Sequence, residues 1–271
     1  MSARRPTVLL AVLVCVLAAG CSGKNSSGDA AATSSATTAL HLVSLGDSDA
    51  TGIGDEEGTG WVQRYADLVA QQTGTDVEVV AHAQEGLTSD ALLADLGQDT
   101  TLQHDVRSAD LVVIGAGGAD LNAGDDAWDA GTCSGTACYQ PLLAAYATNI
   151  EAVVAKVAEL RGGRPTVLRA MSTPNALTGA EDVIPPFLAA SATEVGAFQA
   201  LSLRDSTCAA VRQHGGECAD VVTAFNGPDG TQDAYATGLL NHDDCCYPDA
   251  KGQQEIAQLL LETGTQPRAL S

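Results

Sequence analysis

Short apolar runs alternate with longer stretches of helical periodicity from residue 40 onward. Compact apolar runs predict strands at residues 40–45, 77–81, 111–114 and 166–171. Apolar residues that recur on one side of a helix predict helices at residues 61–72, 91–96, 141–160, 187–213 and 250–261, and a further short apolar run lies at 221–222. The run at 111–114 is the most continuously apolar, so we expect it to be buried on both faces.

Strands that alternate with helices of ten or more residues predict right-handed βαβ units. The fold class is therefore α/β, a three-layer sandwich around a central parallel sheet. In such sheets ligands bind beyond the carboxyl ends of the strands. The residues directly after each predicted strand are therefore the candidates for chemistry.

The first residues have the pattern of an export signal. Arg4 and Arg5 precede an apolar run at residues 8–19, which is shorter than the roughly 20 residues that span a bilayer. The run ends in Leu-Ala-Ala-Gly-Cys at Cys21, which resembles the lipobox of bacterial lipoproteins. The resemblance implies a signal peptide at residues 1–20 and lipidation of Cys21.

A segment rich in Ser, Ala, Thr and Gly follows, at residues 22–38. It has almost no large apolar side chains with which to offset the entropy of ordering, so we interpret residues 21–38 as a lipidated cysteine and a flexible tether. Residues 39–271 are sufficient for one domain with a sizeable core. The predicted location is the cell membrane, on the side that faces away from the cytoplasm.

The charge of the chain limits its partners. Removal of residues 1–20 would take away two arginines and no acidic residue, which leaves 11 basic and 34 acidic residues and a formal charge of −23. Such a balance argues against nucleic acid as a partner and against binding to anionic lipid head groups through charge. We expect a monomer that contacts the membrane only through its lipid.

Besides the lipidated Cys21, the mature chain would keep six cysteines: Cys133, Cys138, Cys208, Cys218, Cys245 and Cys246. An even number in an exported protein predicts disulfides. Metal binding is the weaker alternative because no Cys-x-x-Cys pairs recur and the nearby His242 stands alone. We expect neither a metal nor another cofactor, and the sequence does not choose among the disulfide pairings.

Four blocks stand where the predicted strands end or the last helix begins. They are Gly46-Asp47-Ser48, His82-Ala83-Gln84-Glu85-Gly86, Gly117-Gly118-Ala119-Asp120 and Asp244-Cys245-Cys246-Tyr247-Pro248. In this order they resemble the conserved blocks of the SGNH/GDSL hydrolase family, and the likeness covers about residues 40–261. The resemblance implies that family's flavodoxin-like fold. It implies that Ser48 is the nucleophile of an ester hydrolase. It also implies that the N–H groups of Ser48 and Gly86 form two legs of the oxyanion hole, and that Asp244 is the acid of the triad.

Two positions depart from the family's pattern. The third block has Ala119 where the family has the asparagine that donates a third hydrogen bond to the oxyanion. The last block has Tyr247 at the position of the catalytic histidine. Tyrosine, with a pKa near ~10, is a poor base for a serine hydroxyl at neutral pH. The family's standard mechanism is therefore not intact.

Another histidine would have to act as the base. His82 ends the second predicted strand and His242 lies in the loop that should border the site, so these two are the candidate substitutes. His41 lies within the first strand, where we expect a hydrogen-bonded core residue, and we expect His104 and His214 to face solvent. Structural roles outweigh catalysis for each of the two candidates.

These observations predict an exported, lipid-anchored hydrolase-like protein that acts on O-acyl groups of lipids, sugars or wall polymers, with a compromised triad. The alternative is a catalytically inactive protein of the same fold that binds an acylated or glycan ligand at the cell envelope. A free thiol nucleophile at Cys245 or Cys246 is a minor alternative in an exported protein.

Overall fold

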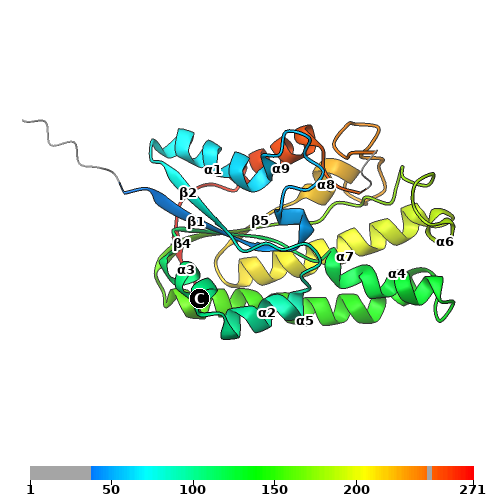
Figure 1. Cartoon of the computed structure of the whole chain (residues 1–271), viewed down its shortest axis with the longest axis horizontal. Helices are drawn as coiled ribbons and strands as arrows, with labels where there is room; N and C mark the ends of the chain where they lie inside the picture. The colour runs from blue at the N-terminus through cyan, green and yellow to red at the C-terminus, as the bar shows by residue number, and fades with distance from the viewer. Residues whose placement is uncertain (1–37, 243–245) are drawn as a thin grey trace, which may run out of the picture. The chain divides into compact units, whose positions relative to one another are not determined.

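Five parallel strands form the centre of the fold, in the spatial order β2-β1-β3-β4-β5 (Figure 1). Their bounds are β1 Leu40–Gly46, β2 Val77–Ala81, β3 Leu111–Gly115, β4 Pro165–Met171 and β5 Glu217–Ala219. The sixth strand, β6 (Arg268–Ala269), pairs antiparallel with β4. The prediction of a central parallel sheet is confirmed for the first five strands. The strand β6 makes the sheet mixed, because the chain turns back along β4 after its last helix.

The computed structural model describes residues 38–242 and 246–271. The predicted signal peptide, most of the predicted tether, and the candidate residues Cys21, Asp244 and Cys245 lie outside the described residues.

The helices cover both faces of the sheet. Their bounds are α1 Gly60–Thr73, α2 Ser89–Gln98, α3 Thr100–Ser108, α4 Asn122–Asp129, α5 Gln140–Arg161, α6 Pro186–Ala189, α7 Ala192–Gln213, α8 Val221–Asn226 and α9 Ala250–Glu262. Three short 3-10 turns are η1 Ser48–Ala50, η2 Ala119–Leu121 and η3 Gly135–Cys138. Among the described residues, no helix is both long enough and apolar enough to span a membrane.

The structure has elements that the sequence pattern did not predict, among them α3, α8 and β5. The apolar pair at 221–222 begins α8, because the Asp220 side chain accepts a hydrogen bond from the N–H of Thr223 and caps a helix there. The short strand β5 comes just before it. The helix α3 was not expected, since its buried positions are only Leu102 and Val106; Asp99 caps its first turn.

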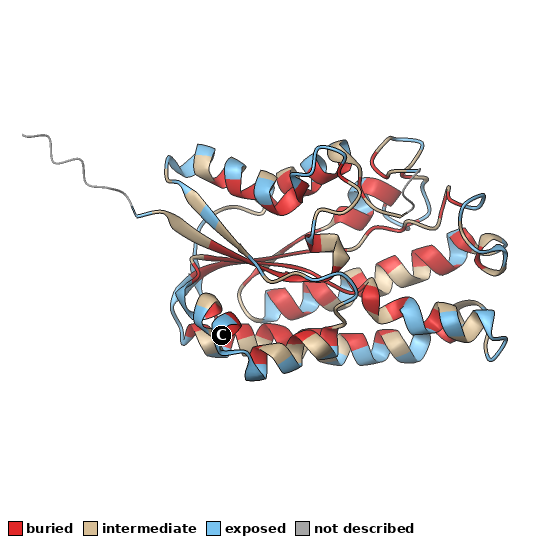
Figure 2. Ribbon diagram, viewed as in Figure 1, coloured by how far each residue is buried: buried red, intermediate tan, exposed pale blue. Residues whose placement is uncertain are grey.

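Alternate residues of β3 enter two separate cores. Leu111 and Val113 belong to the core under α1, α8 and α9, whereas Val112 and Ile114 belong to the core under α2, α5 and α7. All five residues of β3 are buried (Figure 2). The prediction that this strand is buried on both faces is confirmed, and the three-layer α/β architecture follows from it.

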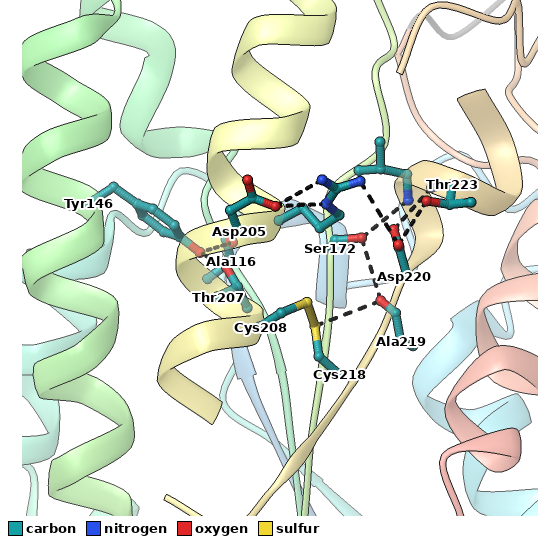
Figure 3. The surroundings of a disulfide bond; sticks show 12 residues. Ala116, Tyr146, Ser172, Asp205, Thr207, Cys208, Cys218, Ala219, Asp220 and Thr223 are labelled. Atoms are coloured by element: carbon teal, nitrogen blue, oxygen red, sulfur yellow. Dashed lines mark hydrogen bonds and ion pairs between the residues drawn. A yellow bond between two sulfur atoms is a disulfide. The ribbon is translucent and has the colours of Figure 1, made fainter. Parts of the chain in front are cut away.

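Two disulfides join described residues, Cys133–Cys138 and Cys208–Cys218. The second connects α7 to β5 (Figure 3). Cys246 is also disulfide-bonded. The prediction of disulfides is therefore confirmed for five of the six cysteines, and Cys245 is outside the described part of the chain.

The same region ties α5 to the end of β3 (Figure 3). The Tyr146 hydroxyl donates to the carbonyl oxygen of Ala116 at 2.8 Å and contacts the Thr207 hydroxyl at 2.6 Å. Because Ala116 directly follows β3, this fully buried tyrosine fixes the start of the loop that carries the third block.

Candidate active site

A cavity of about 410 Å³ lies where the strands end at their carboxyl side. Residues that follow β1, β2, β3 and β4 line it, together with parts of α7 and the segment before α9. The lining includes four residues predicted from the sequence: Ser48, Gly86, Ala119 and Tyr247. The structure therefore brings together residues from all four sequence blocks.

Asp47 connects the first block to the third. Its fully buried carboxylate accepts hydrogen bonds from the N–H groups of Gly117 at 2.9 Å and Ala119 at 3.1 Å. It also accepts from the N–H of Asp49 at 3.1 Å. Burial raises the pKa of Asp47, although these three N–H groups act in the opposite direction. The aspartate of Gly-Asp-Ser thus holds two loops of the site in a fixed relation.

Gly46 allows the first and third strands to end side by side. A Cβ at this position would lie 1.8 Å from the carbonyl oxygen of Gly115, and the backbone has φ +138°. The N–H of the next residue, Asp47, bonds to that same oxygen at 3.0 Å. Only glycine fits this approach of one strand end to the other.

Ser48 begins η1 and faces the cavity. The cap of this turn is Asp47, whose side chain accepts from Asp49, so Ser48 is not used as a capping residue. The Ser48 Oγ makes no hydrogen bond to any residue in the described ranges 38–242 and 246–271. The hydroxyl is thus placed at the cavity without a described base bonded to it.

Ala119 contributes no side-chain donor to the cavity. Its side chain is a methyl group, and its own N–H already bonds to the Asp47 carboxylate at 3.1 Å. Gly86, which also lines the cavity, has φ +75°, a backbone conformation that favours glycine. Ala119 therefore cannot supply the side-chain donor that the family resemblance places beside the backbone donors expected at Ser48 and Gly86.

Tyr247, which the sequence resemblance aligns with the family's histidine, lines the cavity. Its carbonyl oxygen accepts from the N–H of Asn241 at 2.8 Å, and an isolated bridge pairs Leu240 with Pro248. Gly54 packs against it so closely that an added Cβ there would lie 2.5 Å from the Tyr247 Cβ. The backbone that carries Tyr247 is held from two sides, and its neighbour Cys246 is disulfide-bonded.

Neither candidate substitute base lines the cavity. The Nε2 atom of His82 lies 2.8 Å from the carboxylate of Asp105 in α3. The Nε2 atom of His242 lies 3.2 Å from the carboxylate of Asp182, and its ring packs edge-on to Tyr235 at 5.6 Å. Both histidines are engaged with partners elsewhere.

Two further histidines differ from the sequence expectation. His41 is not a core residue: its side chain is 45% exposed and lies 4.0 Å from Glu78. His214 is not simply solvent-facing, since it bonds to Glu151 at 2.9 Å and to the carbonyl oxygen of Ser271. In both cases the partner comes from a distant part of the chain.

Asp49 is the site residue that the sequence reasoning missed. It follows Ser48 in η1, lines the same cavity, and accepts a hydrogen bond from the Thr173 hydroxyl at 2.7 Å. Burial, together with the negative charge of Asp47, raises the pKa of Asp49 to about 7. The available signal was a carboxylate directly after Gly-Asp-Ser.

Two more carboxylates, Glu85 and Asp125, line the cavity. Burial raises the pKa of Asp125, whose carboxylate accepts from the hydroxyl of Tyr139. The described lining includes no lysine, arginine or histidine. Nor does any group of three or more His, Cys, Asp or Glu among the described residues have the arrangement of a metal site.

Comparisons with solved structures agree with this architecture. The chain is similar to the lipase Lip_vut3 from a goat rumen metagenome, with 18% sequence identity, coverage of 84% of this chain and 98% of that one, and a TM-score of 0.68. It is also similar to a catalytic mutant of Axe2, an acetylxylan esterase from Geobacillus stearothermophilus, with 17% identity, coverage of 83% and 93%, and a TM-score of 0.54. These likenesses show the shared fold.

Sequence comparisons lead to the family. The chain is 34% identical over 116 residues to the uncharacterized protein YpmR of Bacillus subtilis (strain 168), which covers 42% of this chain. The matched part spans 45% of the length of that relative. The GDSL-like Lipase/Acylhydrolase family matches residues 44–255, which include all four sequence blocks. On this match and the shared fold, the chain belongs to the GDSL-like lipase/acylhydrolase family.

Proposed function

We propose that this protein is an exported, lipid-anchored ester hydrolase that uses Ser48 as its nucleophile. The observation that supports this most directly is the position of Ser48, which lines a cavity of about 410 Å³ together with Gly86. Export and the lipid anchor rest on the signal-like segment and on Cys21 in the sequence. The substrates are O-acyl groups of lipids, sugars or wall polymers, in keeping with relatives that are described as a lipase and an acetylxylan esterase.

The proposed enzyme works with a compromised triad. Tyr247 supplies no imidazole, and Ala119 supplies no oxyanion donor. Loss of one such donor typically lowers the rate of a serine hydrolase by ~10²–10³, and loss of a triad histidine can lower turnover by ~10⁶. We therefore expect turnover far below that of an enzyme with the complete set.

The test is the labelling of the purified domain (residues 39–271) with a fluorophosphonate probe, read by intact mass and by peptide mapping. An activated Ser48 should be labelled stoichiometrically, and Ser48→Ala should abolish the label. Ser134→Ala, at an exposed serine outside the cavity, is the matched control and should label like the wild type. A folded wild-type domain without label would contradict the proposal.

The second candidate function is binding of an acylated or glycan ligand without turnover. It is favoured by one observation, the absence of any histidine from the described cavity lining. In that case the probe would leave Ser48 unmodified. An O-acetylated oligosaccharide would bind to the wild type, as measured by calorimetry, and would bind less tightly to a Ser48→Trp variant in which the indole fills the cavity.

A further inference from the structure

Ser48 has a nucleophile's position but no described histidine to accept its proton. Attack on an ester carbonyl requires that the hydroxyl proton pass to a base held near it. None of the described cavity-lining residues is a histidine, and the rings of His82 and His242 bond to carboxylates elsewhere. The remaining candidates are the cavity's own carboxylates.

Of these carboxylates, Asp49 lies closest to Ser48 along the chain. The two residues are consecutive in η1, and both line the cavity. Glu85 belongs to the loop after β2, and Asp125 belongs to α4, where it is bonded to Tyr139. Because Asp49 and Ser48 share one turn, movements of the surrounding loops do not separate their backbones.

Three contacts from different parts of the fold hold Asp49 in place. Its N–H donates to the Asp47 carboxylate at 3.1 Å, and its carbonyl oxygen accepts from the Trp61 indole at 2.5 Å. Its Oδ2 atom accepts from the Thr173 hydroxyl at 2.7 Å. Its Oδ1 atom makes no hydrogen bond to any described residue, which leaves that oxygen available to a proton from the cavity.

We propose that Asp49 accepts the proton of Ser48 and so takes the place of the missing histidine. This inference rests on the proposed ester hydrolase function. It identifies the base of that reaction, and it explains why the block reads Gly-Asp-Ser-Asp.

The reaction proceeds in two balanced halves. The Asp49 carboxylate takes the Ser48 proton, either directly or through one water, while Oγ forms a bond to the ester carbonyl carbon. The tetrahedral intermediate collapses with cleavage of the bond to the alcohol oxygen, which receives the proton from Asp49 and leaves as the alcohol. Asp49 then takes a proton from a water that attacks the acyl-serine, and returns it to Ser48 Oγ as the carboxylic acid departs.

The electrostatic surroundings support this role. Burial and the charge of Asp47 raise the pKa of Asp49 to about 7, and the Thr173 hydroxyl moderates the rise. A base is most effective when its pKa lies near the working pH. Burial, and to a smaller extent the negative charges of Asp47, Asp120 and Asp49, raise the pKa of Tyr146. The titratable residues Glu85, Asp125 and Tyr247 line the same cavity as Asp49.

The first experiment compares kcat and KM for hydrolysis of p-nitrophenyl acetate by the wild type and by Asp49→Asn. Asparagine keeps an acceptor for Thr173 but is not basic, so kcat should fall by about 100-fold or more, within the range typical of general-base catalysis, with little change in KM. Asp76→Asn, at an exposed aspartate outside the cavity, is the matched control and should behave like the wild type.

The second experiment uses the pH profile of kcat/KM, which a purely structural role of Asp49 would not move. In the wild type the profile should rise with pH through an apparent pKa of about 7, because burial and the charge of Asp47 raise the pKa of Asp49 to about 7. Thr173→Val removes the hydrogen bond that lowers this pKa, so the rising limb should move to higher pH. Because this variant retains Asp49, it tests whether Asp49 is the base even if Asp49→Asn does not fold.

Two outcomes separate the failure of this inference from the failure of the proposed function. If Ser48→Ala abolishes hydrolysis but Asp49→Asn retains it with an unchanged pH profile, Asp49 is not the base and the hydrolase function stands. If the wild type hydrolyses the ester no faster than Ser48→Ala, both the function and the inference are wrong.

Discussion

At the scale of single residues, Ala119 and Tyr247 stand at the two positions where the sequence is predicted to depart from the family's pattern. Both line the cavity with Ser48. Tyr247 is held by contacts to its backbone and Cβ, from Asn241 and Gly54. A substitution that changes Tyr247 only beyond Cβ therefore leaves those contacts in place. A longer side chain at Ala119 likewise leaves the hydrogen bond from its N–H to Asp47 in place.

The double variant Tyr247→His with Ala119→Asn should hydrolyse a short aryl ester at least ~10² times faster than the wild type, since one restored oxyanion donor alone is worth ~10²–10³. The imidazole would add a base beside Ser48. Asp244 would orient this imidazole if Asp244 holds the family's acid position. The measurement is the initial rate at neutral pH for each single variant and for the pair, because the two changes act on one transition state and need not be additive.

Tyr247→Phe is the control for this experiment. It keeps the ring and removes the hydroxyl, so its rate should stay near that of the wild type. A folded double variant without any gain in rate would show that Tyr247 does not occupy the histidine's place relative to Ser48.

At the scale of elements, His214 joins the end of α7 to α5 and to the last residue of the chain. It bonds to Glu151 at 2.9 Å and to the carbonyl oxygen of Ser271. Burial lowers the pKa of His214, but these two acceptors raise it by more, so the pKa in the folded protein lies above the usual value. The protonated histidine is therefore stabilised by folding.

The stability that this histidine contributes should depend on pH. A raised folded pKa means that the contribution is complete below the unfolded value of 6.5 and is lost as the pH rises through the folded pKa. In urea unfolding, wild type and His214→Gln should therefore differ most at a pH about one unit below the unfolded pKa and least at a pH well above the folded pKa. A difference that is equal at both values would rule out the linkage, and His104→Gln is the matched surface control.

The Cys208–Cys218 disulfide fixes α7 to β5, and its sequence separation is 10. Replacement of both cysteines by alanine should lower the free energy of unfolding by about 2–3 kcal/mol, chiefly because the unfolded chain gains freedom. The Cys133–Cys138 pair has a separation of only 5 and lies beside η3, so its removal should have a smaller effect. Chemical unfolding of both double variants, with oxidised wild type as reference, compares the two losses.

The sequence predicts features that depend on residues close together in the chain, and it does not predict contacts between residues far apart in the chain. The long helices and the four main strands follow from their own periodicity, and the blocks at the strand ends indicated that Ser48, Gly86, Ala119 and Tyr247 share a site. By contrast, His82 pairs with Asp105 at a separation of 23 residues, and Asp49 pairs with Thr173 at a separation of 124. No local pattern indicates such pairs, because they exist only after the strands have been placed in order.

At the scale of the whole molecule, the charge and the predicted anchor act together. Cleavage before Cys21 would leave a mature chain with a formal charge of −23, which would have no electrostatic attraction to anionic lipid head groups. Under the proposed lipidation of Cys21, stable attachment to a membrane would depend on the lipid, and two acyl chains suffice where a single chain is marginal.

Cys21→Ser should remove the lipid and release the protein from the membrane fraction. The measurement is fractionation of cells grown with an alkyne-tagged fatty acid, with detection of both the label and the protein. Cys15→Ser is the matched control, because Cys15 lies in the apolar run that would be removed with the signal peptide. This variant should keep both the label and the membrane location. The released Cys21→Ser protein should still show the Cys133–Cys138 and Cys208–Cys218 disulfides, because neither involves residue 21. A Cys21→Ser protein that stays in the membrane fraction would contradict the lipidation of Cys21, since a domain of this charge has no electrostatic means of staying there.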